Sequence, residues 1–246
     1  MPDRVVGKLG RLPAQMPVGV ELLPHYHAGH RLPAPPPAVA PPGFESWGML
    51  GNDRYGDCGV AGLIHACEAD ATVAQESEQW PDAQSVIDYY LAYTGGADTG
   101  VVLSQFLGYV RRQPQGILGH TVSAFAPIAV GDLSTLRSAI ALYDAAYTGI
   151  AVTAPMQESF QAGRAWTTDD LSSPPIGGHC IPLVGYDDSY VYAVTWGAIQ
   201  PITWPCWHAI ASEAWAVITG ELVARHGDGR GTDLAALQAD LALAGL

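Results

Sequence analysis

Lysine is almost absent from this chain. Lys8 is the single lysine beside ten arginines, and charged residues make up only 14% of the 246 positions. Acidic residues outnumber basic ones, so the net charge is −13 at pH 7. A surface of this sign repels the phosphate backbone of nucleic acids, and no nucleic-acid partner is expected. The same charge favours cationic or neutral substrates.

Apolar runs long enough to cross a membrane are also missing. A transmembrane helix needs about 20 consecutive apolar residues, and no stretch of this sequence is that long. The N-terminus lacks the apolar segment of a signal peptide. We therefore expect no export signal, no membrane span and no membrane partner.

Cysteine is scarce, and its spacing argues against disulfides. The four cysteines are Cys58, Cys67, Cys180 and Cys206. A chain with 48% hydrophobic residues can bury a core without a disulfide framework. Cys58 and Cys67 fall on one predicted helix, too far apart along its axis to pair with each other. We expect free thiols in one large domain or a domain with extensions.

Proline, by contrast, is concentrated in residues 1–45, which hold ten of the nineteen prolines. Proline fixes φ and removes a backbone donor, so this segment is predicted to be an extended, partly polyproline arm. The arm could wrap its own domain, act as a pro-segment, or reach a neighbouring subunit. The remaining residues, 46–246, are predicted to form the globular domain.

Three histidines of the arm, His25, His27 and His30, have a spacing that a metal site could use. No cysteine or carboxylate cluster accompanies them, which favours exposed or capping histidines over metal ligands. We expect neither a metal nor a cofactor.

The order of the predicted elements indicates an α+β fold. The helical part covers about 46–117, the β-rich part about 118–220, and a last helix about 232–244. Residues 155–178 are predicted to be rich in loops. Helices are predicted at 58–73, 83–94, 101–112, 134–143 and 233–243, and strands at 120–128, 148–154, 180–186, 190–195 and 215–218.

The glycine-rich stretch from Gly51 to His65 carries the first chemical signal. Cys58 stands where its helix begins, among unpaired N–H groups and the positive end of the dipole, which favour thiolate over thiol. Asn52, six residues earlier, could fold back towards the sulfur. This is the layout of an activated nucleophile beside a donor for an oxyanion.

The second signal is the stretch from Gly177 to Tyr186. His179 follows two glycines at the start of an apolar strand, where its ring can be presented at a sheet edge. The next strand runs back after an Asp-Asp-Ser turn. Thr195, near the end of that strand, is predicted to fall near His179, and Trp196-Gly197 follows directly.

Together these three blocks resemble the papain-like cysteine peptidases. In that family an amide residue stands six before the cysteine of a Gly-x-Cys motif, the histidine is followed by apolar-Val-Gly-Tyr, and a Trp-Gly pair follows the next strand. The resemblance covers about a fifth of the chain and implies an active-site cleft between a helical and a β half. The Gly-Asn-Asp-x-x-Gly-Asp-Cys variant also resembles uncharacterised proteins of actinobacterial phages and their hosts.

The resemblance assigns a role to each residue. Cys58 would be the nucleophile and His179 the general base, with Asn52 and the Cys58 N–H as the oxyanion hole. Thr195 would orient the imidazole, and Trp196 would shield it from water. Gly56, Asp57 and Gly178 would line the cleft.

Two positions depart from the family. The family has glutamine where this chain has the shorter Asn52. The asparagine that orients the histidine is replaced by Thr195, or by Val194 when positions are counted back from the Trp-Gly pair. Threonine could hold the imidazole weakly, whereas valine could not. His65, two turns beyond Cys58, is interpreted as structural, and Asp57 would oppose a thiolate if it faced the sulfur.

Two functions follow as hypotheses. The first is a papain-like cysteine peptidase, or related amide hydrolase, that cleaves a peptide or protein through an acyl-enzyme on Cys58. The alternative is a catalytically degenerate scaffold in a phage virion, in its capsid or tail, or in phage assembly. Residues 1–45 would then bind phage structural proteins or a second copy of the chain. The expected location is cytoplasmic or virion-associated.

Overall fold

The computed structural model describes residues 4–44, 46–74, 81–227 and 229–246, so positions 1–3 and 45 of the predicted arm lie outside the described residues. In this part of the chain, eight α-helices surround a six-stranded antiparallel sheet, which confirms the α+β class. The helices are α1 (Cys58–Ala74), α2 (Ala83–Thr94), α3 (Leu103–Arg112), α4 (Leu133–Tyr143), α5 (Ala154–Gln161), α6 (Trp204–Ile210), α7 (Gly220–His226) and α8 (Leu234–Leu243). No helix among the described residues is long and apolar enough to cross a membrane.

The sheet has the strand order β1-β6-β2-β3-β4-β5. Its strands are β1 (Val122–Ile128), β2 (Ala146–Val152), β3 (Gly177–Tyr186), β4 (Tyr190–Thr195), β5 (Ala198–Thr203) and β6 (Ala211–Thr219). In the β2–β3 ladder Ile150 stands opposite His179. In the β4–β5 ladder Thr195 stands opposite Ala198, at the last position of β4.

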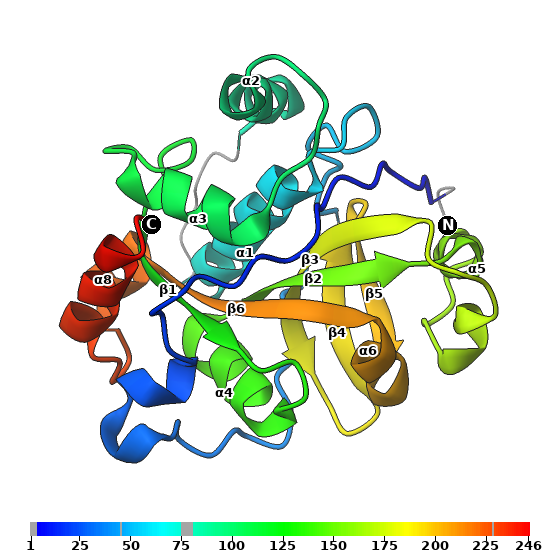
Figure 1. Cartoon of the computed structure of the whole chain (residues 1–246). Helices are drawn as coiled ribbons and strands as arrows, with labels where there is room; N and C mark the ends of the chain where they lie inside the picture. The colour runs from blue at the N-terminus through cyan, green and yellow to red at the C-terminus, as the bar shows by residue number, and fades with distance from the viewer. Residues whose placement is uncertain (1–3, 45, 75–80, 228) are drawn as a thin grey trace.

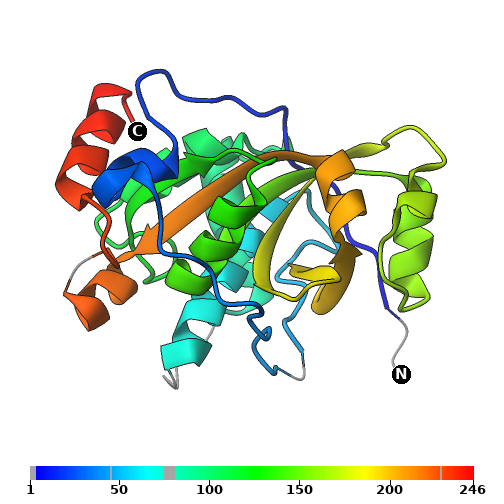
Figure 2. The ribbon, with the colours of Figure 1, turned by 90° about the horizontal axis from the view of Figure 1, so that it is seen from below.

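Helix α1 lies at the centre of the molecule. It packs on β3 and β2, with α2 and α3 on its other side and α4 on the opposite face of the sheet (Figures 1 and 2). Every side chain from Cys58 to Asp70 is buried. The sequence predicted a helix with one apolar face, but a helix buried all round is one enclosed in a core. The Cys58 end is therefore held rigidly.

Residues 155–178 correct the sequence prediction, because they hold more regular structure than expected. Helix α5 covers the start of this region, and a 3₁₀-helix spans Thr168–Leu171. Thr153 caps α5 by accepting a hydrogen bond from the Met156 N–H, and a proline occupies its first turn. Strand β5 and helices α6 and α7 were likewise not predicted.

The proline-rich N-terminal residues lie against the rest of the chain. Val39 and Tyr186 exchange two backbone hydrogen bonds of 2.8 Å. His27 is buried, with its Nε2 2.9 Å from the Tyr143 hydroxyl, which corrects its interpretation as an exposed or capping histidine. His25 and His30 face each other with ring centroids 4.9 Å apart. Division of the chain into an arm and a domain at residue 45 stays a prediction.

Candidate active site

Cys58, Asn52, His179, Thr195 and Trp196 come together around one small cavity between α1 and the sheet. The cavity has a volume of about 10 Å³, which is at most the space of a single water molecule. Cys58 is the first residue of α1 and is only 1% exposed. All four cysteines lie in the described part of the chain, where they are buried and form no disulfide.

The imidazole of His179 is held on one side only. Its Nε2 shares a hydrogen bond of 2.8 Å with Oγ1 of Thr195. Its Nδ1 is buried and makes no hydrogen bond within the described part of the chain. A buried ring nitrogen without a partner is unusual and calls for an explanation. The free nitrogen belongs to a ring that lines the same cavity as the Cys58 thiol.

Trp196 covers the imidazole from one face. The two rings are stacked, with centroids 4.9 Å apart and an angle of 26° between their planes. Trp196 itself has a φ of 45°, in the left-handed region that non-glycine residues rarely adopt. Phe160 and Trp166 pack edge-on against its indole. This aromatic cluster keeps water away from His179, because it leaves the histidine 2% exposed.

Burial favours the neutral form of both Cys58 and His179. Burial raises the pKa of the Cys58 thiol to about 11, although hydrogen bonds with the backbone of Cys180 and Gly10 act in the opposite direction. Burial also lowers the pKa of His179 to about 3, and the nearby Arg11 charge lowers it further. At neutral pH the structure therefore holds a thiol and a neutral imidazole. An ion pair between them requires that water reach the site.

Asn52 is 3% exposed, and its side-chain amide points into a backbone cluster. The Nδ2 group donates to the carbonyl oxygens of Lys8 at 3.0 Å and Tyr55 at 3.1 Å. The Lys8 carbonyl belongs to the chain's N-terminal stretch, far from Asn52 in the sequence. A donor that the sequence suggested for a substrate oxygen is thus already bound to a carbonyl of the same chain.

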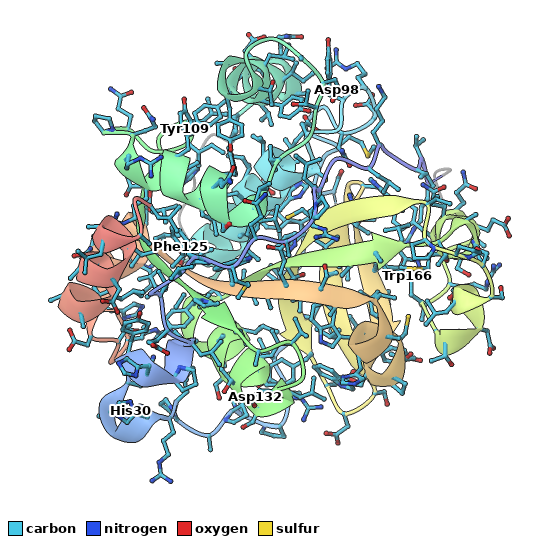
Figure 3. The ribbon with its side chains drawn as sticks, viewed as in Figure 1. His30, Asp98, Tyr109, Phe125, Asp132 and Trp166 are labelled. Atoms are coloured by element: carbon cyan, nitrogen blue, oxygen red, sulfur yellow. The ribbon has the colours of Figure 1, made fainter. Side chains whose placement is uncertain are left out.

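Residues 4–12, here called the N-terminal segment, pass between the helical layer and the sheet (Figure 1). The backbone of Gly10 in this segment contacts Cys58. The Lys8 N–H donates to the Asn52 carbonyl at 2.7 Å, and the Arg11 N–H donates to the Gly178 carbonyl at 3.1 Å. A Cβ on Gly10 would lie 1.7 Å from the Gly56 carbonyl oxygen, so only glycine fits there. Figure 3 shows Asp98 on the helical side of this segment and Trp166 on the sheet side.

The predicted cleft residues lie close to this segment. The Gly56 N–H donates to the Asp98 carboxylate at 2.8 Å. Asp57 is fully buried, and neither of its carboxylate oxygens makes a hydrogen bond within the described residues. Burial raises the pKa of Asp57 to about 7, which the nearby Asn52 amide partly offsets. Its charge in turn raises the pKa of the Cys58 thiol.

Two other predicted residues lie in the cavity wall without joining the polar cluster. The Nε2–H of His65 donates to the Trp47 carbonyl oxygen at 2.9 Å, a structural contact. Val194 is buried and lines the cavity, so Thr195 is the one that reaches the imidazole. Sequence reasoning missed the residues of the N-terminal segment, Lys8, Gly10 and Arg11. The spacing of Gly7 and Gly10, three residues apart among long side chains, was the available signal.

No protein-family profile and no curated protein matches the sequence of this chain. Solved structures are informative about the fold. Xylellain, a cysteine protease from Xylella fastidiosa, is similar with a TM-score of 0.65 and 14% identity. The similarity covers 88% of this chain and 98% of xylellain.

Two further structures share the fold. One is a digestive procathepsin L 3 of Tenebrio molitor larval midgut, with a TM-score of 0.56 and 16% identity over 87% of this chain and 76% of that one. The other comprises the cysteine protease and lectin-like domains of Cwp84, a surface layer associated protein of Clostridium difficile. It gives a TM-score of 0.51 and 10% identity over 76% of this chain and 53% of its own. The chain therefore has the fold of papain-like cysteine proteases.

Proposed function

We propose that the chain is a papain-like cysteine peptidase whose nucleophile is Cys58 and whose general base is His179. The observation that carries this proposal is the state of the imidazole. Thr195 holds Nε2, while Nδ1 is buried without a partner in the cavity that the Cys58 thiol lines. A structural histidine would use both nitrogens or expose one. A general base needs one nitrogen fixed and the other free.

The chemistry follows from these positions. Nδ1 takes the thiol proton, and the thiolate attacks the carbonyl carbon of the scissile peptide bond. The resulting oxyanion receives hydrogen bonds from the Asn52 amide and the Cys58 N–H. The imidazolium then protonates the departing amine, which leaves an acyl-enzyme. Water, deprotonated by the same imidazole, attacks this thioester, and the imidazolium returns the proton as the thiol leaves and the acid product is released.

In this proposal the N-terminal segment acts as a pro-segment that keeps the site closed. The Lys8 carbonyl oxygen accepts a hydrogen bond from the Asn52 side-chain amide, and the backbone of Gly10 contacts Cys58. No substrate carbonyl can reach either group while the segment is in place. Its withdrawal would admit water and return both pKa values towards their ordinary range, where a thiolate–imidazolium pair can form. Activity therefore requires displacement or cleavage of this segment.

The test is labelling of Cys58 with an activity-based thiol probe, followed by peptide hydrolysis. We expect labelling and hydrolysis after limited proteolysis of the full chain, and loss of both in Cys58→Ala and His179→Ala. Cys206→Ala, which removes a buried thiol outside the cavity, is the matched control and should keep both. A native chain that leaves Cys58 unlabelled under all conditions contradicts the proposal.

The scaffold alternative stays a prediction. It implies that Cys58→Ala retains the full biological role of the chain, whereas the peptidase proposal implies that this variant loses it. A complementation assay with Cys58→Ala therefore separates the two functions.

A further inference from the structure

One ion pair ties the N-terminal segment to the sheet beside the candidate active site. Nη1 of Arg11 lies 3.0 Å from Oε1 of Glu213 on β6. The Arg11 side chain is 9% exposed and that of Glu213 is not exposed at all. Exposed ion pairs add little to stability, but a buried carboxylate without a partner is strongly unfavourable. The position of Glu213 therefore requires a cation.

The walls of this site are shaped for a long side chain. Gly149 of β2 stands opposite Glu213 in the sheet ladder. A Cβ at Gly149 would lie 2.5 Å from Cδ of Arg11 and 2.8 Å from the Glu213 carboxylate oxygen. A Cβ at Gly178 of β3 would lie 3.0 Å from Nε of Arg11. Neighbouring strands thus lack side chains where the arginine lies, which leaves a slot that ends at Glu213.

The carboxylate at the end of the slot is fixed in direction. The Trp215 indole N–H donates to Oε2 of Glu213 at 2.9 Å, which leaves Oε1 for the cation. Nη1 of Arg11 also donates to the Leu12 carbonyl at 3.2 Å, and its Nε makes no hydrogen bond within the described residues. Glu213 is thus the acidic group that recognises the guanidinium.

The backbone around Arg11 is held by main-chain hydrogen bonds, which the backbone of any bound peptide could also form. Its N–H donates to the Gly178 carbonyl at 3.1 Å, and the Leu12 N–H donates to the Val101 carbonyl at 2.9 Å. Gly178 immediately precedes His179. The slot is therefore adjacent to the reactive groups, and a peptide bound along this path would present a side chain to Glu213.

We propose that the slot bounded by Gly149, Gly178 and Glu213 is a substrate pocket for arginine, and that Arg11 occupies it in place of a substrate side chain. The inference rests on the proposed peptidase function. Arginine is favoured over lysine because its guanidinium is less strongly hydrated than an ammonium and carries several donors, of which Nη1 meets both Oε1 of Glu213 and the Leu12 carbonyl. The net charge of −13 also draws cationic peptides to the molecule.

The first test compares two peptides that differ at one position, arginine against its neutral isostere citrulline, placed in turn at each position near the scissile bond. We expect kcat/KM to favour arginine by at least about tenfold at one position. In Glu213→Gln this ratio should fall to near one. Equal hydrolysis of both peptides at every position by the enzyme activated by limited proteolysis, with Glu213 intact, would overturn the pocket and leave the proposed function standing.

The second test needs no turnover. In the full chain, Arg11→Ala empties the slot and lowers the melting temperature. Propylguanidinium, an analogue of the arginine side chain, should raise it by about 2 °C or more, whereas neutral propylurea should not. The Arg11→Ala/Glu213→Gln double variant should not respond. An equal response to both compounds would overturn the pocket.

The two tests distinguish failure of the peptidase proposal from failure of the arginine pocket. If no peptide is cleaved and Cys58 stays unlabelled, the peptidase proposal fails, and the propylguanidinium measurement alone decides whether Glu213 forms a cation pocket.

Discussion

Asn52 and Lys8 are joined by two hydrogen bonds of opposite direction. The Lys8 N–H donates to the Asn52 carbonyl at 2.7 Å, and the Asn52 side-chain amide donates to the Lys8 carbonyl at 3.0 Å. The amide that would bind a reaction oxygen in the proposed mechanism is therefore saturated by the chain's own backbone. This closed arrangement leads to predictions about what opens the site.

Substitution of Gly10 should open the candidate active site. A Cβ in Gly10→Ala would fall 1.7 Å from the Gly56 carbonyl oxygen, so the segment must move away from Cys58. We expect alkylation of Cys58 by iodoacetamide at pH 7 to accelerate by at least about tenfold, measured on the Cys58 peptide by mass spectrometry. Gly43→Ala is the matched control, because a Cβ there meets nothing within 4 Å. Equal rates in both variants would show that the segment does not protect the thiol.

Thr195 should be necessary for the alignment of His179. Thr195→Val keeps the shape but leaves Nε2 buried without its 2.8 Å partner, at a cost of about 1–3 kcal/mol. We expect kcat/KM to fall by about 10–100-fold, since a loosely held base transfers protons less efficiently.

Thr195→Ser keeps the hydroxyl and provides the control. It should retain most of the activity and the wild-type pH profile. If Thr195→Val and Thr195→Ser have the same kcat/KM, the threonine hydroxyl does not position the imidazole.

Local sequence patterns were enough to select Cys58, His179 and Thr195 as candidate site residues. Cys58 follows a glycine-rich loop at a helix start, and His179 follows two glycines at a strand start. The hairpin between β3 and β4 has a clear turn, so Thr195 could be located against His179 by counting along two strands. The structure brings these residues to one cavity.

The remaining part of the site depends on contacts that no local pattern encodes. Arg11 and Glu213 are 202 residues apart, and neither lies in a recognisable motif. The path of the N-terminal segment is set by close backbone packing at Gly10. The two glycines at positions 7 and 10 suggest such packing but do not say where in the fold it occurs. Helix α5 was missed for a different reason, because its capping residue Thr153 and the following proline were assigned to a strand end and a loop.

Asp57 should make stability depend on pH. Its folded pKa of about 7 lies above the ordinary aspartate value of 3.8, so between these values the folded state holds a proton that the unfolded state has lost. The stabilisation from Asp57 is thus fully present below about pH 4 and is lost as pH rises towards 7.

Asp57→Asn removes this dependence. The stability of the variant relative to wild type should increase by an amount on the order of 3 kcal/mol between pH 4 and pH 8. Urea denaturation at several pH values measures it. A difference that stays constant with pH would mean that Asp57 titrates normally.

Trp196 should control the pKa of His179. The stacked indole, with centroids 4.9 Å apart, helps to exclude water from an imidazole whose burial lowers its pKa to about 3. In Trp196→Ala, water reaches the ring and the pKa should rise by at least about one unit towards the ordinary value near 6.5. NMR titration of the histidine ring protons measures this shift.

His27 is a control in the same spectra, because its burial against Tyr143 is independent of Trp196. A rise at both histidines would indicate general loosening of the fold, whereas a rise at His179 alone assigns the effect to the lost indole.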